Sequence, residues 1–324
     1  MFPALILSSA TCVVAIWIML RFAARMPQDV PNERSLHERP VPRTGGVAVL
    51  GGIGVSLAAG FVPMNLSIAT ALCLAVISFA DDLHGLPTSV RLIAHLSAAG
   101  LLVWYTLSPM EWWKLFVLCL AVGWITNLYN FMDGADGLAG GMSVIGFGAY
   151  ALASSTSGDA AIASLSAAIC GAAGAFLVYN YHPARIFLGD VGSIPLGFLA
   201  ASLGVVGWRN DAWPLWFPVL VFGPFIGDAT ITLLRRIRRG GRFWTAHREH
   251  YYQRMVRMGM GHRGTALLAY AAMAVCAGAA LYGRDKAPGL QAAVFFSASA
   301  FLTTLAIWVD MRWARYCREA GAPA

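Results

Sequence analysis

Long apolar runs separated by short polar stretches dominate the chain. A membrane-spanning helix needs about 20 mostly apolar residues. Backbone N–H and C=O groups have no water partners in hydrocarbon, so each such run should be helical. We count eleven candidate runs, which predict an all-α, polytopic membrane protein with about 11 transmembrane helices: residues 3–20, 45–62, 64–80, 92–108, 114–132, 139–157, 160–180, 191–207, 212–234, 264–282 and 289–310.

The composition supports a membrane protein. The 324 residues are 58% hydrophobic and 12% charged, whereas a soluble globular chain carries about 25% charged residues. No polar stretch is long enough for a separate soluble domain. We therefore expect residues 1–324 to form a single integral membrane domain. The six cysteines form no CxxC pair.

The basic residues predict the orientation. The runs should alternate direction, so the loops fall into two sets. One set contains 19 of the 23 Lys and Arg residues and the other contains Lys114, Arg209, Arg284 and Lys286. Loops rich in Lys and Arg stay in the cytoplasm. We thus expect the N-terminus outside, the C-terminus inside, and cytoplasmic loops at 21–44, 81–91, 133–138, 181–190 and 235–263. The net charge of +7 follows from this topology and from attraction to anionic lipid, so nucleic acid is not an expected partner.

Five acids fall at the predicted cytoplasmic ends of apolar runs: Asp81, Asp82, Asp133, Asp136 and Asp190. Carboxylates close together at a membrane surface repel one another and favour a bound cation. Hard oxygen ligands favour Mg²⁺, with Mn²⁺ as an alternative. A Mg²⁺ ion that shares its ligands with a diphosphate fits this pattern best.

Two glycine-rich segments carry the most informative acids. In NLYNFMDGADGLAGG, residues 127–141, Asp133 and Asp136 are three apart and share a helix face. Glycines after both acids allow close approach of backbone N–H groups to an anion. In FLGDVGSIPLGF, residues 187–198, Asp190 stands between glycines. A polar turn, an interfacial pair at 81–82 and an ordinary helix cap at 190 are the structural alternatives.

Two predicted cytoplasmic loops are basic. The stretch 235–254 carries seven arginines with His247 and His250, and the stretch 32–46 carries Arg34, Arg39 and Arg43. Such loops bind lipid surfaces or neutralise a pyrophosphate. An acidic metal centre ringed by basic loops suits a phosphate-bearing substrate and a lipid-embedded partner.

Taken in order, RPVPRTGG, DDLHGLP, NLYNFMDGADGLAGG, FLGDVGS and the Arg- and His-rich loop resemble the polyprenyl-phosphate N-acetylhexosamine-1-phosphate transferases. The resemblance covers roughly residues 30–265. It implies transfer of a sugar-1-phosphate from a UDP-N-acetylhexosamine to undecaprenyl or another polyprenyl phosphate, with release of UMP. It also implies a bacterial inner membrane enzyme that starts a cell-envelope polysaccharide such as O-antigen.

The resemblance assigns roles to residues that match the family's motifs. Asp81 and Asp82 match a pair that engages the lipid phosphate, and Arg91 falls where the family usually has Lys. Asn180 and Phe187 match positions that hold the uridine. The full expected site has catalytic Asp81, Asp82 and Asp133, metal ligands Asp136 and Asp190, and substrate-binding Arg43, Arg91, Asn130, Asn180, Phe187, His247, Arg248, His250 and Arg254.

The last cytoplasmic loop departs from the family. Where the family often has His-x-His-His, this chain has His250, Tyr251, Tyr252 and Gln253. This resembles the branch that uses deoxy-N-acetylhexosamines. Tyrosine rings in place of imidazoles would give an apolar wall for a sugar that lacks the 6-hydroxyl, with plain N-acetylglucosamine as the alternative.

Two other function classes remain open from the sequence. A lipid-sugar flippase or secondary transporter would place ionisable groups near the midplane in paired repeats, and no such repeat is visible. A non-catalytic lipid-binding scaffold would not need clustered acids. The oligomeric state is also open, a homodimer included.

Overall fold

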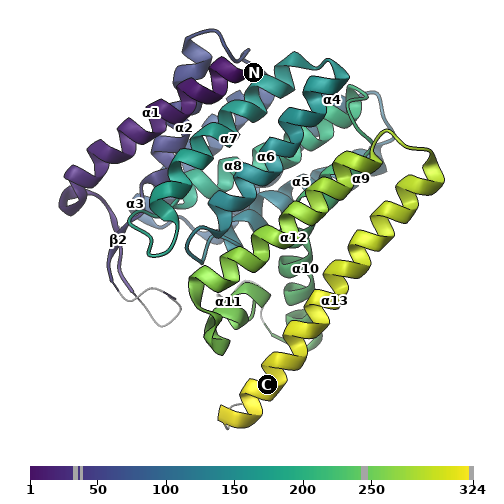
Figure 1. Cartoon of the computed structure of the whole chain (residues 1–324). Coiled ribbons are helices and arrows are strands. Elements are labelled where there is room, and N and C mark those ends of the chain that lie inside the picture. The colour runs from purple at the N-terminus through teal and green to yellow at the C-terminus, as the bar shows by residue number, and fades with distance from the viewer. Residues whose placement is uncertain (32–35, 37–38, 242–246, 321–324) are drawn as a thin grey trace.

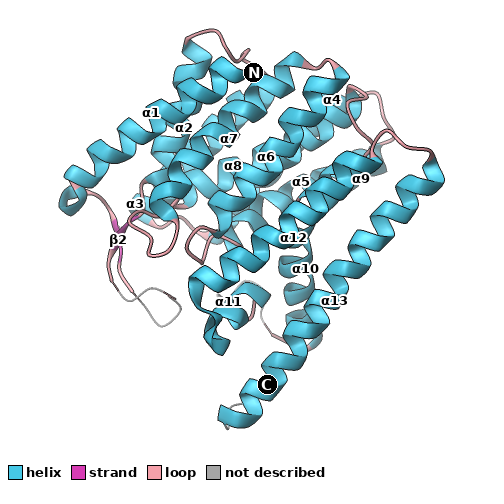
Figure 2. Ribbon diagram, viewed as in Figure 1, coloured by secondary structure: helices cyan, strands magenta, loops and turns pink. Residues whose placement is uncertain are grey.

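The computed structural model describes residues 1–31, 36, 39–241 and 247–320. This part of the chain is almost entirely helical, with one two-residue antiparallel strand pair (Figures 1 and 2). Arg34 and Arg242, which we expected in the basic loops, lie outside it. The elements are α1 (Phe2–Arg21), β1 (Gln28–Asp29), β2 (Val41–Pro42), α2 (Gly45–Ala58), α3 (Leu66–His84), α4 (Thr88–Leu107), α5 (Trp112–Phe131), α6 (Leu138–Ser157), α7 (Ala160–Asn180), α8 (Asp190–Arg209), α9 (Trp216–Val221), α10 (Gly223–Arg238), α11 (Tyr251–Met255), α12 (Gly261–Gly283) and α13 (Pro288–Ala320).

Nine helices in the described residues are long and apolar enough to cross a membrane. The chain is therefore a multi-pass membrane protein, as the apolar runs predict. Two of the eleven expected runs differ. The helix within 45–62 covers 14 residues, or about 21 Å at 1.5 Å per residue, which is shorter than the hydrocarbon core.

The run at 212–234 is also not one helix. It forms α9 and α10, which meet at Phe222 with Pro224 in the first turn of α10. Proline has no N–H to donate to the preceding turn, so it favours a break at this point. The expectation of eleven full-length spans is thus too high for the described residues.

The most buried helices are α6, α7 and α8, which lie among the others. Helix α7 packs against α1 and α6, and α8 packs against α3 and α5. Small residues permit close approach in lipid. A Cβ added to Gly46 of α2 would lie 2.4 Å from the backbone of Gly192 in α8, so both helices start in direct backbone contact.

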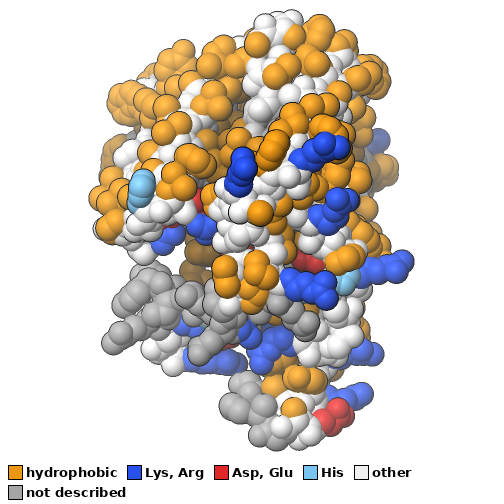
Figure 3. Space-filling model, turned by 90° about the vertical axis from the view of Figure 1, so that its left-hand side faces the viewer, with side chains coloured by type: hydrophobic (Ala, Val, Ile, Leu, Met, Phe, Trp, Pro, Cys, Tyr) orange, Lys and Arg blue, Asp and Glu red, His pale blue; other side chains and the backbone are white. Residues whose placement is uncertain are grey.

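The two termini lie at opposite ends of the bundle, and α13 stands at its edge (Figure 1). Hydrophobic side chains cover the upper end in Figure 3, whereas Lys and Arg gather toward its middle and lower end. The strand pair and the turns that precede α6 and α8 lie at the end where α13 terminates. The predicted acidic motifs are therefore brought to one end of the bundle.

Candidate active site

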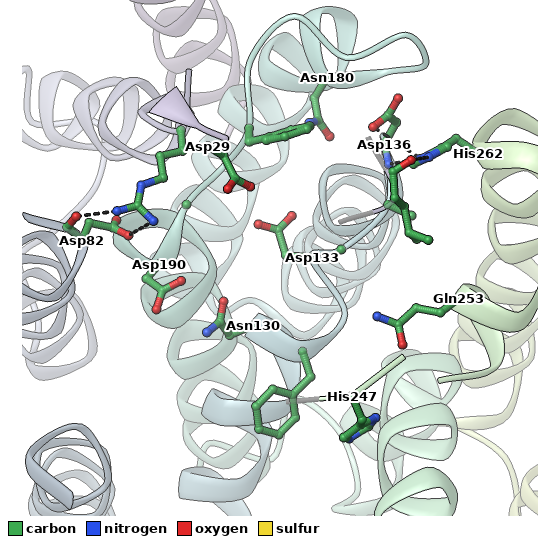
Figure 4. A pocket seen from close by; sticks show the side chains of 17 residues that line it. Asp29, Asp82, Asn130, Asp133, Asp136, Asn180, Asp190, His247, Gln253 and His262 are labelled. Atoms are coloured by element: carbon green, nitrogen blue, oxygen red, sulfur yellow. Dashed lines mark hydrogen bonds and ion pairs between the residues drawn. The ribbon is translucent and has the colours of Figure 1, made fainter. Parts of the chain in front are cut away.

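A cavity of about 390 Å³ lies at this end of the bundle (Figure 4). The ends of α3, α5 and α7 meet there with the starts of α6 and α8. The cavity is lined by Asp29, Leu36, Arg43, Asp82, Asn130, Phe131, Asp133, Gly134, Ala135, Asp136, Asn180, Phe187, Gly189, Asp190, His247, Gln253 and His262. Nine of the fourteen residues expected from the sequence are among them.

The paired aspartates at the end of α3 have different surroundings. Asp81 does not line the cavity. Its Oδ2 lies 3.0 Å from Nη1 of Arg91, and its Oδ1 accepts the N–H of Leu86 at 2.6 Å. The same Arg91 nitrogen lies 3.9 Å from Asp190 Oδ2. Asp81 therefore holds Arg91 beside Asp190, which is a positioning role and not direct contact with the cavity.

Asp82 connects three segments at the cavity wall. Its Oδ1 lies 3.5 Å from Arg43 Nη1 and its Oδ2 accepts the N–H of Val191 at 3.3 Å, while Arg43 also donates to the Asp82 carbonyl. Gly189 makes this junction with φ of +73°, and an added Cβ would lie 2.5 Å from the Arg43 carbonyl oxygen. Only glycine fits this combination of left-handed backbone and close approach.

Asp133 occupies the middle of the acidic group. Figure 4 shows it near the centre of the cavity, with Asp29, Asp190 and Asn130 on one side and Asp136 on the other. Burial, followed by the nearby carboxylates of Asp190, Asp29 and Asp82, raises the pKa of Asp133 well above its ordinary value. All charges that shift it are negative, and it forms no ion pair within the described residues. Hard carboxylate oxygens without a basic partner are a donor set that fits Mg²⁺.

Asn130 is held in place by the start of α8. The hydroxyl of Ser193, which is fully buried, donates to Asn130 Oδ1 at 2.8 Å. Because the amide oxygen is occupied, the NH₂ group of Asn130 is the end that donates, and it donates to the Asp190 carboxylate. This contact joins the NxxDGxDGL stretch to the GDVGS motif, as we expected from their spacing in the membrane topology.

Asp136 is placed differently from our expectation. Its carboxylate accepts from the Ala184 N–H at 3.1 Å and lies 2.7 Å from His182 Nδ1, and its Oδ1 lies 3.4 Å from His262 Nδ1. Figure 4 places it across the cavity from Asp190. The metal pair of Asp136 and Asp190 stays a prediction, and the contacts of Asp136 with His182 and Ala184 favour Asp133 as the partner of Asp190.

The group Asp136, His182 and His262 has ligand atoms within 4.8 Å of one another. However, His262 already uses both ring nitrogens: Nδ1 accepts the Asp136 backbone N–H at 3.1 Å, and Nε2 donates to the Leu36 carbonyl at 3.1 Å. The rings of His182 and His262 also lie nearly parallel, 6° apart. A satisfied hydrogen-bond network accounts for this group without a metal.

Asn180 and Phe187 both line the cavity, as expected. Asn180 is 3% exposed and bridges two turns, since its Oδ1 accepts the Gly137 N–H and its Nδ2 donates to the Ile186 carbonyl, both at 2.9 Å. The Phe187 N–H donates to Pro42 at 2.7 Å, and its carbonyl accepts the Gly45 N–H at 2.8 Å. The amide thus shapes the wall, while backbone pairing with the first loop holds the backbone that carries the phenyl ring.

His250 does not line the cavity. It is buried at 4% exposure, and its Nδ1 lies 3.1 Å from Asp228 Oδ1. The Asp228 carboxylate also accepts the N–H groups of Tyr251 at 2.9 Å and Tyr252 at 3.0 Å. Asp228 therefore caps the start of α11, and His250 belongs to this anchor.

Arg254 is also directed away from the cavity. Its Nη1 lies 3.2 Å from Asp310 in α13, and its guanidinium stacks on Tyr251 and Trp313. Arg235 forms two 2.7 Å hydrogen bonds with the same Asp310. These contacts fasten α13 to α10 and α11. Arg248 is partly exposed and does not line the cavity.

The tyrosine wall expected from the last loop is wrong. Tyr251 and Tyr252 are only 6% and 2% exposed. Their hydroxyls donate to Asp310 and to the Phe131 carbonyl, respectively. Neither side chain lines the cavity. The loop instead presents His247 and Gln253 to it, which removes the basis for a preference for deoxy sugars.

Sequence reasoning missed four residues at or beside the cavity. Asp29 lies in β1 of the β1–β2 pair and Gln253 lies in α11, and both line the cavity. His182 and His262 lie beside Asp136 and contact its carboxylate. The signal for His182 and His262 was weak because single histidines stand in unremarkable loops. Gln253 stands in the run that departs from the family's histidines, and Asp29 stands in the predicted cytoplasmic loop 21–44 without a motif around it.

Comparisons with known proteins find relatives that match most of the chain. The sequence model of glycosyl transferase family 4 matches residues 64–208. The chain is 30% identical over 288 residues to a probable undecaprenyl-phosphate N-acetylglucosaminyl 1-phosphate transferase of Bacillus subtilis, covering 82% of this chain and 80% of that relative. It is 30% identical over 292 residues to decaprenyl-phosphate N-acetylglucosaminephosphotransferase of Mycobacterium tuberculosis, covering 74% and 71%. A phospho-N-acetylmuramoyl-pentapeptide-transferase of Shouchella clausii is 29% identical over 238 residues, covering 62% and 73%.

The family match contains DDLHGLP, the NxxDGxDGL stretch and the GDVGS motif, which meet at the cavity. The match to the Bacillus subtilis relative extends over most of both chains. On these grounds the chain belongs to glycosyl transferase family 4, among the polyprenyl-phosphate hexosamine-1-phosphate transferases.

Proposed function

We propose that this enzyme transfers N-acetylglucosamine-1-phosphate from UDP-N-acetylglucosamine to a polyprenyl phosphate and releases UMP. The observation that carries the proposal is the acidic cavity at one end of a membrane helix bundle, with Arg43 and Arg91 beside it. The names of the relatives in Bacillus and Mycobacterium support the donor and the acceptor.

The position of the cavity suits a reaction between a lipid and a water-soluble nucleotide. Asp82 lies near the end of α3, and Asp190 starts α8, so both are at the boundary of apolar helices. A lipid phosphate can reach this level while its chain stays in the bilayer. A secondary transporter would instead place ionisable groups near the midplane, so the transferase fits the observed placement better.

The proposed chemistry is an in-line displacement. An oxygen of the lipid phosphate attacks the β-phosphorus of the UDP-sugar, a new P–O bond forms, and the bond between the β-phosphorus and the bridging oxygen of UMP breaks. A phosphate monoester has its second pKa near 6, so most of it is dianionic at neutral pH. Because Asp82 is already paired with Arg43, we assign this pair to orientation of the lipid phosphate more than to proton removal.

We propose that Asp133 and Asp190 hold Mg²⁺, or Mn²⁺, with the diphosphate of the donor. The support is the donor chemistry of Asp133, a carboxylate among carboxylates without a basic partner in the described residues. The ion would supply neutralisation of the charge that develops on the leaving UMP. Arg91, held by Asp81, would add positive charge beside Asp190.

We propose that the cavity faces the cytoplasm of a bacterial inner membrane, where UDP-sugars are made. The support is the charge distribution, because 19 of 23 basic residues belong to the same set of loops as the cavity. The lipid diphosphate sugar would then be the starting unit of a cell-envelope polysaccharide, such as O-antigen.

The test is transfer by purified protein in lipid nanodiscs with polyprenyl phosphate and a panel of radiolabelled UDP-sugars. We expect label in the lipid fraction from UDP-N-acetylglucosamine, dependent on Mg²⁺. The Asp190→Asn variant should bind lipid and remain folded without turnover. Absence of labelled lipid with every donor in the panel would reject the transferase.

A further inference from the structure

The cavity has one wall to which the proposed reaction assigns no role. In Figure 4, Asp82, Asp29 and Asp190 occupy one side, with Asn180 above, while Gln253 and His247 lie on the side away from these three acids, below Asp136. Phe131, 43% exposed, also lines the cavity. In the proposed reaction the acids and arginines bind the phosphates and the metal, and Phe187 matches a position that holds the uridine. The wall of Phe131, His247 and Gln253 is left for the sugar.

The orientation of the Gln253 carboxamide is fixed by its own helix. Gln253 is the third residue of α11, and its Oε1 accepts the backbone N–H of His250 at 3.2 Å. A backbone N–H can only donate, so the oxygen must be the end that meets it. The NH₂ end is then directed into the cavity, as Figure 4 shows. The oxygen and nitrogen of the carboxamide are told apart by this hydrogen-bond partner, because the two ends of an amide have nearly the same shape.

The loop that carries Gln253 is held firmly. Asp228 accepts three hydrogen bonds from residues 250–252, and the Tyr252 hydroxyl donates to the carbonyl of Phe131 at the end of α5. Gln253 itself is 8% exposed. A side chain with this little freedom holds its NH₂ group in one orientation, which is the preorganisation that a recognition site needs.

The neighbouring His247 offers the same kind of group. Its Nδ1 accepts the N–H of Glu249 at 3.4 Å, so its remaining ring proton is on Nε2. Burial, together with the nearby His250 and Arg236, lowers the pKa of His247 to about 4. The wall therefore offers uncharged N–H donors at neutral pH.

The matching ligand group accepts hydrogen bonds and carries no charge. A phosphate would favour the arginines at the opposite wall, and a hydroxyl would also need an acceptor. The carbonyl of a 2-acetamido group meets both conditions. We propose that Gln253 is a specificity-determining residue whose carboxamide N–H donates to the acetamido carbonyl of the donor sugar. This inference rests on the proposed function.

The test compares UDP-N-acetylglucosamine with UDP-glucose, which lacks the acetamido group, in two variants. Gln253→Met removes the amide at similar size. Gln253→Glu keeps an oxygen for the His250 N–H, and so keeps the helix cap, but removes the N–H donor. We expect both variants to lower kcat/KM for UDP-N-acetylglucosamine about tenfold, the effect of one lost hydrogen bond. In both variants the preference for UDP-N-acetylglucosamine over UDP-glucose, which is the ratio of the two kcat/KM values, should fall about tenfold, because loss of the cap on the His250 N–H in Gln253→Met acts on both donors alike. Inhibition by UMP should be unchanged in Gln253→Met.

Gln291→Met is the matched control, because the Gln291 amide binds Trp216 and the backbone of Arg284 and Lys286, at the far end of α13. An equal loss with both donors, or weaker inhibition by UMP in Gln253→Met, would assign Gln253 to phosphates or to folding and overturn the inference. An unchanged preference for the acetamido donor in both variants would do the same. Absence of product in the wild type would instead reject the proposed function.

Discussion

Substitution of Asp228 tests whether its carboxylate holds the last cytoplasmic loop in position. Its carboxylate is 9% exposed and accepts from the Tyr251 N–H at 2.9 Å, from the Tyr252 N–H at 3.0 Å, and meets His250 Nδ1 at 3.1 Å. In Asp228→Asn the oxygen can keep the Tyr251 and His250 contacts. The new NH₂ group then faces the Tyr252 N–H, so two donors oppose each other.

The magnitude follows from these contacts. A buried donor left without a partner costs about 1–3 kcal/mol, and loss of the charge weakens the remaining hydrogen bonds by about 1 kcal/mol. The docked loop should thus be destabilised by about 2–4 kcal/mol, which lowers the ratio of docked to undocked loop by about 30- to 1000-fold. His247 and Gln253 leave their cavity positions in the undocked state, so kcat/KM should fall.

Hydrogen exchange of the amides in 250–255 and kcat/KM for transfer measure the two effects. We expect faster exchange in this segment, lower kcat/KM, and little change in exchange of α6 to α8. Asp285→Asn is the control, since Asp285 has a 71% exposed side chain and pairs with its neighbour Arg284. Wild-type exchange and wild-type kcat/KM in Asp228→Asn would refute the anchoring role of this carboxylate.

Four further outcomes are expected. Gly189→Ala should reduce activity strongly and lower thermal stability by about 1–2 kcal/mol or more, because alanine is strained at φ of +73° and its Cβ meets the Arg43 carbonyl; a wild-type melting temperature would contradict this. Asp29→Asn should raise the Mg²⁺ concentration needed for half-maximal rate, measured by metal titration, since Asp29 acts on Asp133; an unchanged titration would remove Asp29 from the metal site. His247→Gln should lose less thermal stability than the wild type when the pH is lowered from 7 to 5. The folded pKa of His247, about 4, lies below the ordinary 6.5, so the wild type loses stability as pH falls below 6.5. Equal losses in the two proteins would count against a neutral buried ring. Glu319→Cys in a cysteine-free background should resist an impermeant thiol reagent applied outside intact cells, and rapid labelling would reverse the orientation; native Cys317 is unsuitable because it is 2% exposed.

Much of the fold could be predicted because lipid imposes simple rules on sequence. Apolar runs of sufficient length gave nine helices in the expected places. The two exceptions depend on details that run length does not capture. Helix α2 ends at Ala58 although apolar residues continue to 62, and Pro224 breaks the run at 212–234. Both shortfalls reflect local backbone chemistry within an apolar stretch.

The acidic half of the site could also be predicted, since motifs at the ends of helices on one membrane side must meet. The pairing of particular side chains could not. Asp133 and Asp136 share a helix face by spacing, yet the segment 132–137 is a turn, and their carboxylates face different neighbours. Likewise, the arginine and histidine run looked like a phosphate-binding surface, whereas His250 and Arg254 bind Asp228 and Asp310, which lie far away in sequence.

The central claim is that a sugar-1-phosphate is transferred, and not a sugar alone. The direct test uses UDP-N-acetylglucosamine labelled with ³²P at the β-phosphorus, with purified protein, Mg²⁺ and polyprenyl phosphate. We predict that the label enters the lipid product and that unlabelled UMP is released in equal amount, with neither seen in Asp190→Asn. Release of labelled UDP with an unlabelled glycolipid would contradict the account.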